Sequence, residues 1–157
     1  MVTAIEAAPR VVRKTFKYRT SVEWLGRRAG VLSAQAKMPF RVASPPEFRG
    51  EPDVWSPEDL FVAAIDTCLM MTFVSKAEKK QLAVDGYMSE AEGILEFVGD
   101  GYQFTKVTVK PTILITDSRF AQEIIRTIEE AHRDCLVARS CNAQIIVQPD
   151  VELTSIE

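Results

Sequence analysis

The sequence has no apolar run long enough to cross a bilayer as a helix. Its most apolar stretch, Leu60 to Val74, is interrupted by Asp66 and falls short of the roughly 20 residues that a hydrocarbon core of roughly 30 Å requires. The N-terminus also lacks the charged start, apolar stretch and small-residue cleavage site of a secretory signal. We therefore expect no membrane partner, and we interpret this stretch as part of a core helix.

An excess of positive charge is missing as well. The 19 lysines and arginines are outnumbered by 22 acidic residues, which gives a net charge of -3. Nucleic acids normally attract concentrated lysine and arginine, so we expect no nucleic-acid partner. The segment from Arg10 to Lys17 is basic, but a solvated tail or strand edge accounts for it.

Repeats and low-complexity segments are absent, and only three cysteines occur among 157 residues. Without an export signal these thiols indicate a reducing compartment, where a disulfide is usually transient and chemical, and we expect a cytoplasmic protein. A composition that is 46% hydrophobic and 26% charged is typical of a globular domain. We expect an N-terminal arm over residues 1–14 and a single domain over residues 15–157.

The domain is predicted to begin with a β-hairpin. Thr15 to Leu25 mixes aromatic, β-branched and charged residues, which is typical of a strand with one solvent-exposed face. Ala29 to Lys37 can form the antiparallel strand beside it. The turn between them then contains or adjoins Arg27 and Arg28. Prolines and a glycine punctuate the connection from Met38 to Val54, which leaves room for at most one short strand.

A helix is predicted to begin after Ser56, because a serine cap followed by Pro57 and two carboxylates suits a helix N-terminus. Its body is apolar on more than one face, which describes a central helix, and it ends in the polar Lys76 to Gln81. Alternation, helical spacing and turn residues predict the remaining elements. They are strands at Tyr87 to Val98 and Tyr102 to Thr116, a second helix from Asp117 or Ser118 to about Leu136, and a last strand within Asn142 to Val151.

Two of the cysteines lie on the two predicted helices. Cys68 is roughly three turns into the first helix and Cys135 is near the end of the second, so only packing of the helices could join them. A cysteine in a buried helix most often acts as a small hydrophobic residue. Each of these two, however, stands within a longer local pattern.

That pattern resembles the OsmC and organic hydroperoxide resistance family. The segment WSPEDLFVAAIDTCLMMTF, followed about sixty residues later by IEEAHRDCLVARS, carries the resemblance, and the strands AEGILEF and FTKVTVKPTI extend it over most of the chain. It implies an α+β, OsmC-like fold in which curved antiparallel sheets pack around two long central helices. It also implies that two chains intertwine as a homodimer.

The same resemblance implies a thiol-dependent peroxidase that reduces organic hydroperoxides to alcohols without flavin, haem, metal or other cofactor, with hydrogen peroxide as a competing substrate. The family's cysteine pair falls on Cys68 and Cys135, its helix-start glutamate on Glu58, and its hairpin arginine on Arg27 or Arg28. An arginine would favour the thiolate and polarise the peroxide, and a glutamate would hold the guanidinium. The plainer interpretations are a carboxylate on the helix dipole and a solvated turn.

In the implied mechanism, Cys68 attacks the terminal peroxide oxygen, releases an alcohol and becomes a sulfenic acid. Cys135 condenses with it to form a disulfide, and an external thiol or dithiol reductant restores both cysteines. Phe61, Leu69, Met70 and Phe73 are either an apolar substrate pocket or ordinary core residues.

Two residues depart from this pattern. Asp66 precedes Cys68 by two positions, and a carboxylate close to a thiol would raise the thiol pKa, although positions two apart on a helix do not share a face. Cys141 is a third thiol, which we interpret as an inert strand residue and, alternatively, as a competing resolving thiol.

Three other interpretations stay open. His132, Cys135 and Cys141 are metal-ligand types, but their spacing does not form a standard zinc knuckle. A non-catalytic OsmC-like dimer could sense oxidation or bind an apolar small molecule through the same cysteines. A purely structural member of the family would have two unreactive thiols.

Overall fold

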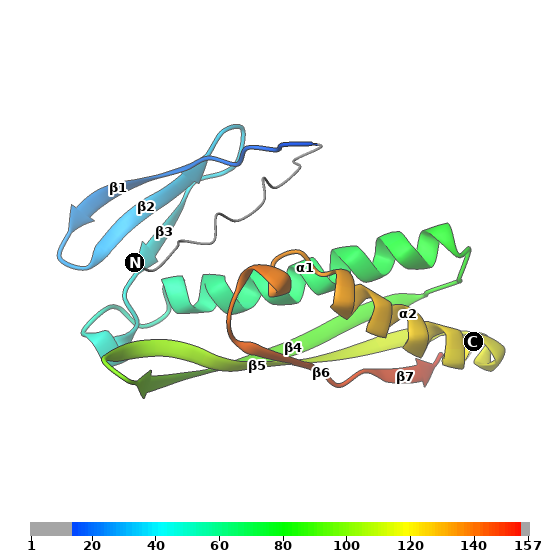
Figure 1. The fold of residues 1–157 in the computed structure, drawn as a ribbon. Helices are drawn as coiled ribbons and strands as arrows, with labels where there is room; N and C mark the ends of the chain where they lie inside the picture. Colours follow the sequence, from blue (N-terminus) through cyan, green and yellow to red (C-terminus); the bar gives the residue numbers. More distant parts are fainter. Residues whose placement is uncertain (1–13, 155–157) are drawn as a thin grey trace, which may run out of the picture. The chain divides into compact units, whose positions relative to one another are not determined.

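The computed structural model describes residues 14–154 and divides after Val54 (Figure 1). The first unit is Met1–Val54 and the second is Trp55–Glu157. The boundary falls at the end of the proline-punctuated connection, and the expectation of a single domain over residues 15–157 stays a prediction. The N-terminal arm lies outside the described residues, apart from Lys14.

The first unit contains a three-stranded antiparallel sheet in the order β1-β2-β3. Its strands are β1 (Thr20–Gly26), β2 (Ala29–Ala34) and β3 (Phe40–Ala43), followed by the 3-10 helix η1 (Pro46–Phe48). The hairpin, its arginine turn and the single short strand of the connection are therefore as predicted. The first strand begins at Thr20 rather than Thr15, because β2, its partner among the described residues, ends opposite Thr20 at Ala34.

The second unit packs two helices on a mixed four-stranded sheet. In chain order it contains α1 (Pro57–Lys79), β4 (Gly86–Val98), β5 (Gly101–Ile115), the 3-10 helix η2 (Ser118–Phe120), α2 (Ala121–Asp134), the 3-10 helix η3 (Ala138–Ser140), β6 (Gln144–Val147) and β7 (Asp150–Leu153). Strands β4 and β5 form the predicted antiparallel hairpin. Strands β6 and β7 run parallel to β5, which corrects the expectation of purely antiparallel sheets. The helical crossover through α2 returns the chain in the direction of β5, as parallel pairing requires.

The predicted last strand is two strands, because the pairing with β5 is interrupted at two prolines. Val109 of β5 pairs with Val147 of β6, and Thr112 pairs with Asp150 of β7. Pro111 and Pro149 lie between these pairs, and neither has a backbone N–H to donate. The break separates β6 from β7 along one edge of β5.

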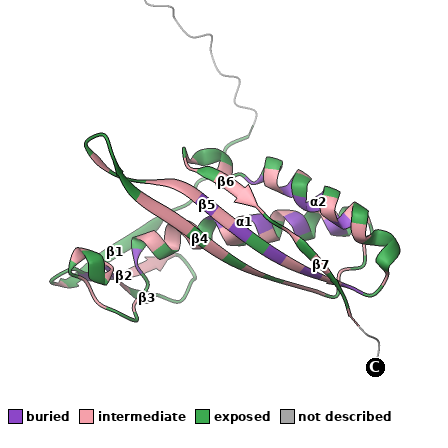
Figure 2. Cartoon of the chain, turned by 90° about the horizontal axis from the view of Figure 1, so that it is seen from below, coloured by how far each residue is buried: buried purple, intermediate pink, exposed green. Residues whose placement is uncertain are grey.

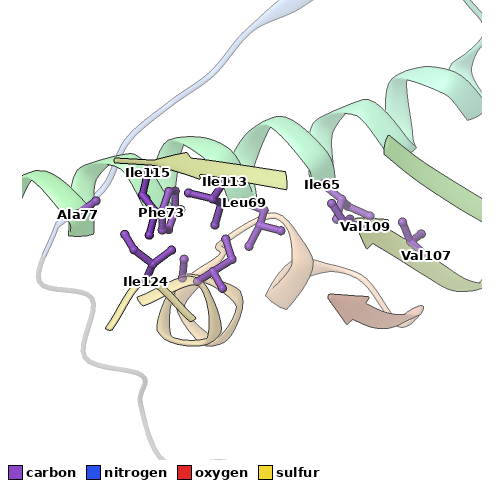
Figure 3. Close-up of a cluster of buried hydrophobic side chains, with 11 residues drawn as sticks. Ile65, Leu69, Phe73, Ala77, Val107, Val109, Ile113, Ile115 and Ile124 are labelled. Carbon is purple, nitrogen blue, oxygen red and sulfur yellow. The ribbon is translucent and has the colours of Figure 1, made fainter. Parts of the chain in front are cut away.

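The core of the second unit lies between the helices and β5 (Figures 2 and 3). Alternate residues of β5 are buried, as the two-residue repeat of a strand requires. Every fourth residue of α1 faces them, which agrees with the repeat of a helix. Full burial of one such side chain contributes about 1.5 to 3 kcal/mol. The buried members are Ile65, Leu69, Phe73 and Ala77 of α1, Val107, Val109, Ile113 and Ile115 of β5, and Ile124, Ile128 and Ala131 of α2.

Helix α1 is longer than the apolar run suggested. It begins at a capping box, in which the Ser56 hydroxyl accepts from the Asp59 N–H at 3.1 Å and Asp59 Oδ2 accepts from the Ser56 N–H at 2.9 Å. The helix has 23 residues, and its most apolar 18-residue window has a mean hydropathy of 1.6, so it meets the length and composition of a membrane span, contrary to the expectation from Leu60 to Val74 alone. A core helix meets the same criteria, and one face of α1 packs into the cluster described above.

Candidate active site

Two thiols meet where α1 and α2 pack together. Cys68 is half-buried on α1, Cys135 is 1% exposed at the C-terminal cap of α2, and both are free thiols. The two side chains are neighbours, close enough for Cys68 to raise the pKa of Cys135. The helix packing that the sequence could only suggest thus brings this pair together.

The environment of Cys135 keeps its thiol protonated at neutral pH. Burial, reinforced by the neighbouring Cys68, raises the pKa of Cys135 to about 11, while the backbone N–H groups of Ala138 and Val137 oppose the shift. The enclosed position of Cys135 therefore favours its protonated thiol.

Helix α2 runs antiparallel to α1 beside this pair, and two lysines connect the helices, Lys76 within α1 and Lys80 at its C-cap. Lys76 Nζ lies 2.6 Å from Asp134 Oδ2, and this hydrogen-bonded ion pair lowers the pKa of Asp134. Lys80 Nζ lies 2.9 Å from both Glu123 Oε1 and Glu130 Oε1. Sequence reasoning missed these contacts. Their only signal was the i,i+4 spacing of the lysines, and nothing in that spacing names the partner helix.

Glu58 lies in the first turn of α1 and has an unsatisfied oxygen. Its Oε2 atom is buried and accepts no hydrogen bond from residues 14–154. A buried carboxylate oxygen without a donor is costly, so this position suits a cationic partner. The helix dipole accounts for a carboxylate in this turn, but not for the missing donor.

The two hairpin arginines belong to the first unit and differ in their contacts. The Arg28 guanidinium donates to the Phe48 carbonyl, which ties the hairpin to η1. The Arg27 backbone has φ 50 and its carbonyl accepts from Trp24 Nε1 at 2.9 Å, while its exposed guanidinium forms no hydrogen bond with the described residues. The pKa of Glu51 is lowered mainly by its hydrogen bonds to Arg41 and, to a smaller extent, by the charge of Arg27.

Asp66 faces the sheet rather than α2. Its Oδ1 accepts a hydrogen bond of 2.7 Å from the Ser89 hydroxyl on β4, whereas Cys68 contacts Cys135 on α2. Nearby, the Tyr87 hydroxyl is buried and has no hydrogen-bond partner of normal geometry within the described chain. Burial raises the pKa of Tyr87 to about 12, with Ser89 opposing the shift and Asp66 reinforcing it.

Cys141 is separate from the thiol pair. Its Sγ donates to the Ala138 carbonyl at 3.2 Å, and it packs beside the core. Cys141 is also absent from the groups that shift the pKa of Cys135, and the structure favours the inert interpretation of Cys141.

The other candidates have structural roles or lack a site. Leu69 and Phe73 belong to the core, and the Phe61 ring stacks on Phe104 with centroids 4.5 Å apart. Within residues 14–154, no cluster of three or more histidine, cysteine or acidic side chains could hold a metal ion. A shallow hollow over β4 and β5 is lined by residues that include Glu90, Lys110 and Gln148, and neither thiol lines it.

Comparison with known proteins decides the family. The model of the OsmC-like protein family matches residues 50–150, which include α1, α2 and both thiols. The chain belongs to the OsmC-like protein family. The resemblance noted from the two cysteine segments is thereby confirmed, as is the mixed α+β fold with two helices and sheets.

Solved OsmC-like structures share this fold. An OsmC-like protein of unknown function from Vibrio cholerae superposes with a TM-score of 0.79 at 23% identity, over 86% of this chain and 99% of its own. An organic hydroperoxide resistance protein from Elizabethkingia anophelis has a TM-score of 0.71 at 19% identity, over 91% of this chain and 100% of its own. The uncharacterised protein YmaD of Bacillus subtilis is 19% identical over 80% of this chain and 86% of its own.

Proposed function

We propose that the protein is a thiol-dependent peroxidase that reduces organic hydroperoxides to alcohols. The observation that carries the proposal is the contact between Cys68 and the buried, protonated Cys135 at the junction of the two helices. Membership of the OsmC-like family supports it, as do fold relatives that are organic hydroperoxide resistance proteins.

Each cysteine has one step in the proposed cycle. The Cys68 thiolate attacks the terminal oxygen of the hydroperoxide, the O–O bond breaks, and the alkoxide takes up a proton and leaves as an alcohol. The resulting sulfenic acid condenses with the Cys135 thiol, which forms the disulfide and releases water. An external thiol or dithiol then reduces the disulfide by two exchange steps. No metal or other cofactor is needed for this cycle.

Glu58 and a hairpin arginine complete the proposed site, as the family resemblance implies. The unsatisfied Glu58 oxygen suits a cation, and Arg28 is committed to the Phe48 carbonyl, so we assign the arginine's role to Arg27. In this proposal Arg27 favours the Cys68 thiolate and polarises the peroxide oxygens. The Asp66 carboxylate is engaged by Ser89 on β4 and not by a group of α2.

We also propose that the active protein is a homodimer in the cytoplasm. One flank of α1 consists of small or apolar side chains at helical spacing, namely Ala64, Thr67, Met71 and Val74, and all four are exposed. Only 22% of the most apolar window of α1 is buried within the chain. A second copy would cover this open flank of α1, and an apolar flank of this kind is typical of a helix that packs on another helix.

The test is organic hydroperoxide consumption under excess dithiol, with hydrogen peroxide as the competing substrate. We expect sustained turnover by the parent and by Cys141→Ser, which is the matched control for loss of a thiol. Cys68→Ser should lose all turnover, and Cys135→Ser should turn over slowly at best. A parent that oxidises once and then stops would instead establish the non-catalytic sensor, and unchanged turnover by Cys68→Ser would refute the proposed mechanism.

A further inference from the structure

The contacts between α1 and α2 form a ladder of three rungs. The thiols of Cys68 and Cys135 are the first rung, and Lys76 with Asp134 is the second. The third rung joins Lys80 to Glu123 and Glu130, farther along the same two antiparallel helices. The second rung therefore lies between the thiols and the third, and Asp134 is the chain neighbour of Cys135.

Cys135 needs such a support because α2 ends directly before it. The Cys135 backbone leaves the helix with ψ 107, and its N–H reaches the His132 carbonyl only at 3.4 Å. The last turn of a helix frays readily, since its carbonyls have no partners within the helix. The orientation of the Cys135 thiol thus depends on what holds the end of α2.

The charge of Asp134 makes this dependence stronger. A carboxylate at the C-terminal end of a helix is repelled by the negative end of the helix dipole. The Lys76 ammonium, whose side chain is only 23% exposed, neutralises that carboxylate. Without Lys76, Asp134 would weaken the turn that positions Cys135.

From this geometry we infer that the Lys76–Asp134 ion pair is a positioning device that fixes Cys135 against Cys68 and favours their disulfide. The inference rests on the proposed redox role of the thiol pair. Groups held in the reacting geometry behave as if they were at a high local concentration. Loss of Lys76 should lower that effective concentration without touching either thiol.

The third rung offers a matched control. Lys80 is the C-cap residue of the helix that contains Lys76 and also binds carboxylates of α2, but its partners lie at least five residues before Cys135. Replacement of Lys80 should loosen the helix pair without freeing its thiol-bearing end. Lys76→Met and Lys80→Met therefore separate the positioning of Cys135 from general stability.

The experiment measures the equilibrium constant for Cys68–Cys135 disulfide formation by exchange with dithiothreitol, without any peroxide. We expect Lys76→Met to lower this constant about three- to tenfold, which is a rise of about 14 to 30 mV in reduction potential. Asp134→Asn should shift it less, because it removes the repulsion from the dipole together with the ion pair. Lys76→Arg should restore the parent value, and Lys80→Met should keep it.

A second readout is the lifetime of the Cys68 sulfenic acid, trapped by a dimedone probe after one equivalent of hydroperoxide. The lifetime should rise in Lys76→Met by a factor similar to the fall in the equilibrium constant, and should not change in Lys80→Met. Equal equilibrium constants for the parent and Lys76→Met would overturn the inference, as would equal effects of the two lysine variants. Failure of the proposed peroxidase would appear separately, as a disulfide that forms in the dithiol equilibrium while no peroxide is consumed.

Discussion

The Ser89 hydroxyl on β4 donates a hydrogen bond of 2.7 Å to Asp66 Oδ1 on α1. This contact explains how an apolar helix accommodates a carboxylate in the middle of its length. A half-buried charge is tolerated when it is hydrogen-bonded, and a hydrogen bond to a charged group contributes more than a neutral one. The contact also ties α1 to the sheet on the flank opposite to the thiols' partner helix.

Replacement of Ser89 by alanine should destabilise the second unit by about 1.5 to 3 kcal/mol, because Asp66 would lose its donor. Urea unfolding of the two proteins measures the difference. The same substitution in an Asp66→Asn background should cost clearly less, since no charge would be left unpaired. Equal costs in both backgrounds would show that the hydrogen bond to the carboxylate is not what stabilises this contact.

Gly93 on β4 is predicted to be intolerant of any side chain. A Cβ atom there would lie 2.6 Å from Val62 Cγ2 and 2.7 Å from Phe104 Cε1, closer than van der Waals contact permits. We expect Gly93→Ala to cost about 1 to 3 kcal/mol in unfolding free energy, because the Phe104 ring is held by its stack on Phe61. Gly101→Ala is the control, since its Cβ would meet nothing within 4 Å. Equal melting temperatures for Gly93→Ala and Gly101→Ala in thermal unfolding would contradict this account.

Replacement of the two arginines of the first hairpin should have different effects on catalysis. Under the proposed mechanism, Arg27→Met lowers kcat/KM for an organic hydroperoxide by about 10²- to 10³-fold, the usual effect of removing one electrostatic group from the reacting centre. Arg28→Met should leave catalysis within a few-fold and instead loosen η1, because Arg28 is bound to the Phe48 carbonyl. Steady-state kinetics and unfolding of both variants test the assignment. The reverse pattern would place Arg28 at the site.

Local sequence signals, such as a helix cap or alternating hydrophobicity, predicted those elements of the fold that depend on one segment alone. The Ser56 cap located the start of α1, and alternation along Thr105 to Lys110 located the buried face of β5. Pro149 can be read in the sequence, but the interruption of strand pairing also depends on Pro111 of the neighbouring strand β5. The parallel direction of β6 and β7 likewise depends on where the α2 crossover returns the chain, which no single segment determines.

The candidate site divides in the same way. The family resemblance predicted roles for Cys68, Cys135 and Glu58, and these roles stay predictions, whereas the proximity of the two thiols required the helices to pack. The partners of Lys76 and Asp66 could not be predicted, because each lies on another element more than twenty residues away in sequence. Charge and spacing along one helix indicate that a side chain can form a bond, but only the packing shows with which residue.

Stability should fall at alkaline pH through Cys135. Its pKa is raised to about 11 from an ordinary value near 9, mainly by burial, so the folded state holds this proton more tightly than the unfolded state does. The stabilisation is therefore complete below about pH 9, and it is lost as the pH rises through about 11. The full loss is about 3 kcal/mol, as a shift of this size implies.

Urea unfolding under a phosphine reductant, at a series of pH values from 7 to above 10, measures this loss. Cys135→Ala should show a shallower decline with pH than the parent, because it has no buried thiol to ionise. Cys141→Ala controls for the removal of a thiol outside the pair and should follow the parent. Tyr87, whose pKa is raised to about 12 by burial, continues the decline in all three proteins above pH 10. Parallel curves for the parent and Cys135→Ala would show that the Cys135 thiol is hydrated rather than enclosed between the helices.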